Sequence, residues 1–125
     1  MAKEIAVQFR FFFELPDDKY PTLLLLEFQY DKEIDWYEVK VFRGEEVIAY
    51  LNGYANQGWA PQVNNLWVAE AFRRKGIASQ MMTKVEEYFG QVPLPATPVA
   101  DNEAARSFWD NYAAGRSTKG WKDQE

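Results

Sequence analysis

A run of basic residues followed by small ones is the stretch of this sequence best suited to chemistry. Arg73, Arg74 and Lys75 precede Gly76, and the segment from Leu66 to Ser79 predicts a strand, a short loop and a helix. Gly76 would lie in the first turn of that helix, where unpaired backbone N–H groups and the helix dipole attract anions. The pattern predicts a pyrophosphate site, although it contains neither Gly-x-Gly-x-x-Gly nor a Walker Lys-Ser/Thr pair. The alternative is a solvated, charged turn.

Two missing residue types narrow the possible reactions. The chain contains no Cys and no His, which excludes disulfides, thiolate nucleophiles, Ser-His-Asp triads and metal sites built on Cys or His. We therefore expect no metal site, and any acid–base step would depend on carboxylates, Tyr, Lys, backbone groups or water. A covalent acyl-thioester intermediate is likewise excluded, because no thiol is present to form it, which favours direct transfer.

The composition is that of a globular domain. The 125 residues are 47% hydrophobic and 17% aromatic, which is enough for one domain with its own core. The formal net charge of −5 argues against a duplex nucleic-acid partner, because phosphate binding needs clustered Lys and Arg. The longest aliphatic run, Leu23 to Leu26, is too short for a membrane span, and no signal peptide is visible. We expect a cytoplasmic protein without a membrane partner.

The N-terminal half has mostly the period-2 pattern of strands. Residues 5–14 alternate apolar and other side chains, with one buried face expected at Ile5, Val7, Phe9, Phe11 and Phe13. Residues 36–43 and 47–51 predict a hairpin, and residues 65–68 predict a short central strand.

Residues 22–30 fit two kinds of element. Leu24, Leu26, Phe28 and Tyr30 alternate as in a strand, whereas Pro21 at a first helical position and the run of Leu would suit a helix. We favour the strand.

The C-terminal half changes to a helical period. One helix face is predicted by Ile77, Met81, Val85, Tyr88 and Phe89, with Gly90 as its C-cap. A second helix is predicted around residues 105–112, with Asp101 or Asn102 as N-cap. Between them, the prolines of residues 92–99 argue against a well-paired interior strand.

Two motifs in this half resemble those of the GNAT superfamily of N-acetyltransferases. The strand Leu66–Val68 followed by Arg73-x-x-Gly76-x-Ala78 is similar to motif A of the family, Arg/Gln-x-x-Gly-x-Gly/Ala. Residues 102–109, Asn-Glu-Ala-Ala-Arg-Ser-Phe-Trp, resemble motif B, Asn-x-x-Ala-x-x-Phe-Tyr. The motifs have the family's order and approximate separation, and the predicted hairpin suits its second and third strands.

The resemblance implies where acetyl-CoA would bind. Backbone N–H groups from Arg74 to Ser79 would hold the pyrophosphate, and a bulged strand at Trp67 and Val68 would pair with the pantetheine arm. The Val68 N–H would polarise the thioester carbonyl, which makes Val68 a catalytic candidate. Asn102 would contact the pantetheine or order the loop before the last helix. The implied cofactor-binding residues are Trp67, Val68, Arg73, Arg74, Lys75, Gly76, Ile77, Ala78, Ser79, Asn102, Phe108 and Trp109.

The sequence departs from the family pattern at the acid–base groups. Trp109 stands where the family carries a Tyr that protonates the leaving CoA thiolate, and an indole cannot do this. Either Tyr112, one turn further on, is the catalytic acid, or water protonates the thiolate, or the protein binds CoA without turnover. The family's glutamate base before motif A also has no counterpart, because Gln62, Asn64 and Asn65 occupy that region.

Together the patterns and the resemblance imply an α+β, GNAT-like fold in a single acyl-CoA-binding domain over residues 1–125. The expected sheet is mixed, mostly antiparallel and splayed at its fourth strand, beside Val68. Two helices from the C-terminal half are expected to pack on it.

The implied function is acetyl transfer from acetyl-CoA to a primary amine of a small molecule or a protein. The whole net charge of −5 falls on residues 1–60, which favours a cationic acceptor. Tyr54 and Trp59 are either surface aromatics of an acceptor site or ordinary packing. The rival hypothesis is a catalytically inactive CoA-binding or protein-interaction module, and a homodimer is left open.

Overall fold

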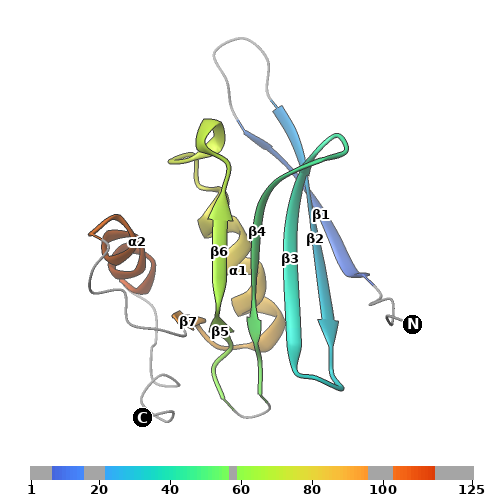
Figure 1. Ribbon diagram of the computed structural model, residues 1–125, viewed down its shortest axis with the longest axis vertical. Helices are drawn as coiled ribbons and strands as arrows, with labels where there is room; N and C mark the ends of the chain where they lie inside the picture. The colour runs from blue at the N-terminus through green and yellow to red at the C-terminus, as the bar shows by residue number, and fades with distance from the viewer. Residues whose placement is uncertain (1–6, 16–21, 57–58, 96–102, 115–125) are drawn as a thin grey trace.

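The computed structural model describes residues 7–15, 22–56, 59–95 and 103–114. Figure 1 shows one twisted sheet with helices behind and beside it. Its strands and helices are β1 (Val7–Leu15), β2 (Thr22–Asp31), β3 (Trp36–Arg43), β4 (Glu46–Tyr54), β5 (Gln62–Val63), β6 (Asn65–Val68), the 3₁₀ turn η1 (Glu70–Phe72), α1 (Ile77–Phe89), β7 (Leu94–Pro95) and α2 (Glu103–Ala113). Five strands form the main sheet in the order β1-β2-β3-β4-β6, and β5 pairs with β7 separately.

Strands β1 to β4 form an antiparallel meander with one apolar face. In β2, Leu24, Leu26 and Phe28 are fully buried, so residues 22–30 form the strand that their alternation favours. A helix would have spread these three side chains around its circumference. The opposite face of the sheet is open at Phe12 and Leu23, which are 60% and 57% exposed.

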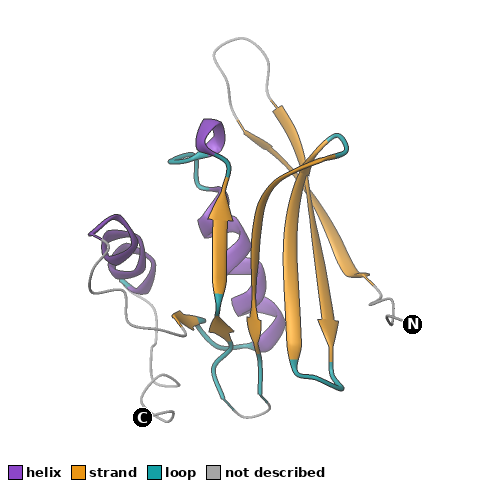
Figure 2. Cartoon of the chain, viewed as in Figure 1, coloured by secondary structure: helices purple, strands orange, loops and turns teal. Residues whose placement is uncertain are grey.

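Helix α1 covers the buried face of the sheet, behind β4 and β6 in Figure 2. Ile77, Met81 and Val85 are buried, as the helical spacing predicts, but Met82 is buried too and Tyr88 is 38% exposed. The packed face is therefore rotated toward Met82 relative to the prediction.

Glycines mark both ends of α1. Gly90 is its C-cap with φ 74°, as predicted. At the other end, the expectation that Gly76 lies in the first turn is wrong, because Gly76 is the N-cap with φ 83°. A left-handed residue cannot continue a right-handed helix, so the chain turns at Gly76 and the helix begins at Ile77.

Strand β6 lies at the edge of the main sheet, which corrects the prediction of a central, buried strand. It pairs with β4 on one side, and no described strand pairs with its other side. Asn65 and Trp67 are exposed and Leu66 and Val68 are half-buried. It is also the fifth strand of this sheet rather than the fourth, because the meander before it supplies four.

A short parallel pair, β5 and β7, occupies the place where the sheet would otherwise continue. Gln62 and Val63 pair with Leu94 and Pro95 over two residues only, in keeping with the prolines of that segment. The edge of β6 beside Val68 is therefore left open, which agrees with the expectation that the sheet is splayed beside this residue.

The approach of β5 to β4 depends on Gly53. A Cβ at this position would overlap the backbone carbonyl oxygen of Gln62, so no other residue fits without displacing a strand. The same carbonyl accepts a hydrogen bond of 2.6 Å from the hydroxyl of buried Tyr37.

Helix α2 lies beside the sheet, beyond β6, rather than behind it (Figure 1). Through Trp109 and Tyr112 it contributes to the same hydrophobic core as α1. The predicted N-cap residues, Asp101 and Asn102, lie outside the described residues.

Candidate functional site

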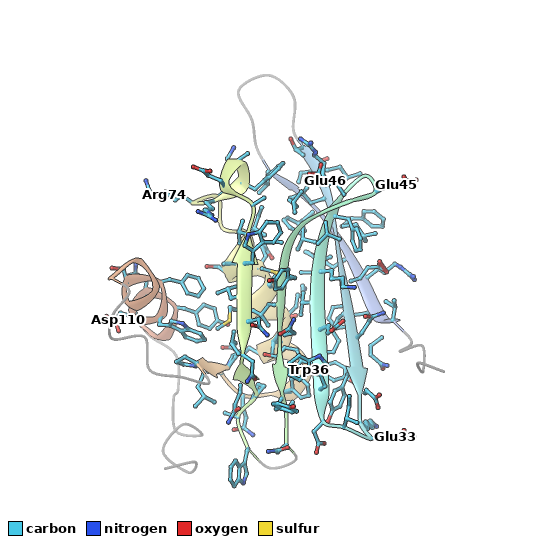
Figure 3. All side chains as sticks on the ribbon, in the orientation of Figure 1. Glu33, Trp36, Glu45, Glu46, Arg74 and Asp110 are labelled. Carbon is cyan, nitrogen blue, oxygen red and sulfur yellow. The ribbon has the colours of Figure 1, made fainter. Side chains whose placement is uncertain are left out.

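A cleft of about 650 Å³ lies where the free edge of β6, the loop after it and the start of α1 meet α2. It is the position at which the sequence predicted ligand binding. The lining residues are Leu66, Trp67, Val68, Phe72, Arg73, Arg74, Gly76, Ile77, Ala78, Ser79 and Phe108. Figure 3 places Arg74 on the loop above the cleft and Asp110 on α2 at its side.

The hydrogen-bond alternation of β6 determines which peptide groups face the cleft. The Ala69 N–H donates to the Ile48 carbonyl at 2.8 Å, and Val68 stands opposite Ala49. In an antiparallel ladder the next residue directs its N–H and C=O to the other side. Val68, and two residues earlier Leu66, therefore direct their peptide groups toward the free edge.

Leu66 is a residue that the sequence reasoning missed. Period-2 alternation places its peptide group on the same edge as that of Val68, about 6.7 Å further along the strand. The signal was present in the sequence, since any strand through Val68 gives Leu66 the same direction. Which edge of the strand stays free, however, depends on the pairing with β4.

Arg73 fastens the loop after β6 to the strand. Its guanidinium Nε donates to the Val68 carbonyl at 2.8 Å. This bond occupies the Val68 carbonyl and leaves the Val68 N–H to a ligand. The side chain of Arg73 is therefore directed at the strand, and it positions Val68.

The loop before α1 has the backbone form of an anion site. Arg74 has φ 62° and Gly76 has φ 83°, on either side of Lys75. Both residues are left-handed, so the chain turns sharply just before the N-terminus of α1, where helix N–H groups are unpaired. The N-cap makes no side-chain hydrogen bond, and the first turn of α1 contains no acidic residue. The N–H groups of that turn therefore follow three basic residues in the chain and have no carboxylate among them.

The aromatic residues of α2 divide between the cleft and the core. Phe108 lines the cleft, whereas Trp109 and Tyr112 are 7% and 4% exposed and belong to the core. The Tyr112 hydroxyl lies 3.5 Å from Oε1 of Glu86 on α1. Asn102 lies outside the described residues.

The amides before β6 have structural partners. The Asn64 side-chain oxygen accepts from the Tyr54 N–H at 3.2 Å, and the Asn65 side chain donates to that of Asn52 at 2.7 Å. No carboxylate lines the described part of the cleft. A base would therefore have to act through water or come from outside these lining residues.

Comparison with known families agrees with this geometry. The model of the acetyltransferase (GNAT) family matches residues 3–112 of the chain. The chain belongs to the GNAT acetyltransferase family. The recognition from motifs A and B and the α+β GNAT-like fold are thereby confirmed.

Solved structures resemble this GNAT chain at low identity. One is an aminoglycoside acetyltransferase from an uncultured soil metagenomic sample in complex with trehalose. It is 17% identical to this chain with a TM-score of 0.50, and the match covers 67% of this chain and 59% of that chain. The complex of the same enzyme with sisomicin gives 14% identity, TM-score 0.52, and coverage of 66% and 60%. The chain thus spans about three fifths of the length of these neighbours, and the likeness concerns the fold. No curated protein matches the chain.

GNAT membership implies acetyl-CoA as co-substrate, and the cleft residues fit it. A Cβ built at Gly76 meets nothing within 4 Å, so this wall of the cleft is open where a pyrophosphate would need close approach to the backbone. Outward N–H and C=O groups on β6 match the amides of a pantetheine arm.

Neither described helix has the length and apolarity of a membrane span. Among the described residues, no three His, Cys, Asp or Glu side chains group as metal ligands.

Proposed function

We propose that this GNAT protein transfers the acetyl group of acetyl-CoA to a primary amine by direct attack in a ternary complex. The observation that carries the proposal is the continuity of the cleft. The outward peptide groups of Leu66 and Val68 lead into the bare N-terminus of α1 through a loop with three basic residues. A ligand with a peptide-like arm and a pyrophosphate needs these two kinds of donor, one after the other.

The residues of the cleft would act as follows. Bound acetyl-CoA supplies an activated acetyl group. The N–H groups from Arg74 to Ser79 hold the pyrophosphate, and the free edge of β6 around Val68 holds the arm, whereas the backbone N–H and C=O of Trp67 face β4. The Val68 N–H donates to the acetyl carbonyl oxygen, where it stabilises the charge that develops during attack. Leu66 provides a second outward N–H on the same edge.

The proton donor to the leaving thiolate stays a prediction. Tyr112 lies one turn beyond Phe108, which lines the cleft, but its buried hydroxyl is directed toward Glu86. Tyr112 would have to exchange this contact for one with the thiolate, and water is the alternative donor. Trp109 supplies no acidic proton.

The acceptor that we propose is a cationic amine. The net charge of −5 falls on residues 1–60, away from the basic loop at residues 73–75, and a negative field attracts ammonium groups. The fold neighbour with sisomicin is named an aminoglycoside acetyltransferase, which adds support for this class of acceptor. Cytoplasmic location and a homodimer stay predictions.

Thiol release from acetyl-CoA tests the proposal most directly. The purified protein is incubated with acetyl-CoA and a panel of polyamines, aminoglycosides and lysine-bearing peptides, and free CoA thiol is measured. Release that depends on the amine, with the acetylated amine found by mass spectrometry, is the expected result.

The second candidate, an inactive CoA-binding module, is favoured by Trp109 and by the buried position of Tyr112. It predicts that acetyl-CoA raises the melting temperature, or that CoA co-purifies, while no amine causes thiol release. If millimolar acetyl-CoA leaves the melting temperature unchanged and no thiol is released, both candidates are excluded.

A further inference from the structure

A second cavity of about 500 Å³ lies at the other end of α1. Its walls come from the end of β2, the β2–β3 turn, residues 55, 56 and 59 after β4, and the C-terminus of α1, the lower end of the molecule in Figure 1. Four aromatic residues line it, Tyr30, Trp59, Tyr88 and Phe89, together with the polar Asp35 and Asn56. An α-helix of 13 residues is about 20 Å long, so this cavity is separate from the cleft at the start of α1.

The aromatic walls are held at fixed angles by their mutual packing. Tyr30 meets Phe89 edge to face at 5.1 Å between ring centroids, and Tyr88 meets Phe89 at 5.0 Å. Tyr88 and Trp59 nevertheless remain 38% and 49% exposed. Aromatic ring faces that solvent can reach attract cations through the ring quadrupole.

Asp35 gives the cavity its negative charge. Its backbone has φ 55°, unusual for a residue other than glycine, and its carbonyl accepts a 2.8 Å hydrogen bond from the Ala55 N–H. This bond holds the turn against the loop after β4 and so keeps the carboxylate in the cavity wall. Burial, and then the charge of Asp35, raise the pKa of Tyr30. Lys32 also lines the cavity, and no ion pair joins it to Asp35 among the described residues.

The end of α1 adds to this charge. The last carbonyl groups of a helix are unpaired and carry the negative end of its dipole. Gly90 satisfies one of them by donating to the Glu86 carbonyl at 2.7 Å. The remaining carbonyls of the last turn lie next to Tyr88 and Phe89.

We propose that the cavity at the C-terminus of α1 binds a small organic ammonium ion. The Asp35 carboxylate and the helix end attract the charged nitrogen, and Trp59, Tyr88 and Tyr30 contact the carbon body. The site is separate from acetyl transfer, because it lies at the opposite end of α1 from the CoA cleft.

Titration with butylammonium chloride, followed by ¹H–¹⁵N NMR, tests this site in the full chain without CoA. The neutral isostere 1-butanol is titrated in parallel. We expect butylammonium to shift the indole N–H resonance of Trp59 and the amides of residues 32–35 and 88–91, with millimolar affinity. 1-Butanol should shift these resonances at least fivefold less at the same concentration. Equal shifts with both compounds would show ordinary apolar binding and overturn the proposal.

Two variants locate the interaction. Asp35→Asn should weaken butylammonium binding about fivefold, and it should fold because Asn tolerates a left-handed backbone. Trp59→Ala should weaken it about threefold, read on the amides of residues 88–91. Glu45→Gln, on the β3–β4 turn at the other end of the sheet (Figure 3), removes the same charge and should leave the affinity unchanged. If Asp35→Asn and Glu45→Gln behave alike, the carboxylate of Asp35 does not bind the cation and the proposal fails.

Discussion

Gly76 is the residue whose replacement separates ligand binding from folding. In Gly76→Val the new side chain points into open space, which is where the pyrophosphate is proposed to lie. The wild-type protein should gain about 2.7 kcal/mol of stability from acetyl-CoA at a hundredfold excess over the dissociation constant, and Gly76→Val should gain none. Thermal unfolding with and without acetyl-CoA measures this difference.

Gly44→Val provides the matched control. Gly44 has φ 61°, and its Cβ would also meet nothing within 4 Å, but it lies in the β3–β4 turn. Both variants should lose about 1–3 kcal/mol without ligand from the left-handed backbone. Only Gly44→Val should keep the full stabilisation by acetyl-CoA. If Gly76→Val keeps it as well, the loop before α1 does not bind the cofactor.

Tyr112 and Trp109 allow a direct test of the proton donor. If Tyr112 protonates the thiolate, Tyr112→Phe should lower kcat about 10²- to 10⁴-fold, whereas Trp109→Phe should retain most of the activity. Because Tyr112 is buried, melting temperatures must be measured beside the rates. Similar, small effects of both substitutions would assign the proton to water.

Tyr37 links the pH dependence of stability to a buried hydroxyl. Burial raises its pKa above the ordinary value of 10.0, so above pH 10 the unfolded chain releases a proton that the folded chain keeps. Stability should therefore fall as the pH rises through this range. Tyr37→Phe should reduce this fall, leaving the part due to Tyr30, whose pKa burial also raises.

Urea unfolding at pH 7 and above pH 10 measures this dependence. At pH 7, Tyr37→Phe should cost about 1–3 kcal/mol, because the Gln62 carbonyl loses its 2.6 Å hydrogen bond. Tyr50→Phe, at an exposed position, should leave the stability at pH 7 as in the wild type. An alkaline dependence unchanged in Tyr37→Phe would contradict this account.

At the scale of elements, the edge position of β6 can be tested with proline. Val68→Pro removes an N–H that makes no hydrogen bond to β4. Trp67→Pro instead removes an N–H that faces β4, because Trp67 stands opposite Tyr50 in the ladder. Proline is tolerated in edge strands where the N–H faces outward. Val68→Pro should therefore fold with little loss of stability and lower kcat about 10²- to 10³-fold.

Trp67→Pro should mainly destabilise the protein by breaking the ladder. Circular dichroism melts and thiol-release rates of the two variants separate these effects. If Val68→Pro retains wild-type kcat, the Val68 N–H is not the donor to the acetyl carbonyl. Leu66→Pro then tests the other outward N–H in the same way.

At the scale of the molecule, the uneven charge predicts salt-dependent turnover. Negative charge is concentrated in residues 1–60, and electrostatic attraction between exposed charges is screened beyond about 8 Å at physiological ionic strength. For cationic amines, kcat/KM should fall severalfold between 20 and 500 mM salt, whereas zwitterionic amino acids should be poor acceptors with little salt dependence. A preference for zwitterions, or salt-independent rates for cations, would exclude a cationic acceptor.

Local sequence pattern determined much of the architecture. Alternation over Leu24, Leu26 and Phe28 predicted β2 correctly, and Gly90 correctly marked the end of α1. The motif from Arg73 to Ala78 predicted the loop and helix of the cleft. Each of these features depends on residues close together in the chain, whose side-chain period or backbone freedom sets the local conformation.

The tertiary structure decided the features that depend on distant partners. β6 is an edge strand because β7 pairs with β5 instead of continuing the sheet, and that free edge directs Leu66 and Val68 into the cleft. Tyr112 is buried because α2 packs into the same hydrophobic core as α1. The cavity around Asp35 exists because three segments far apart in the chain meet at the end of α1. Strand neighbours and cavities arise from long-range packing, and a pattern of period two or 3.6 carries no information about which surfaces will meet.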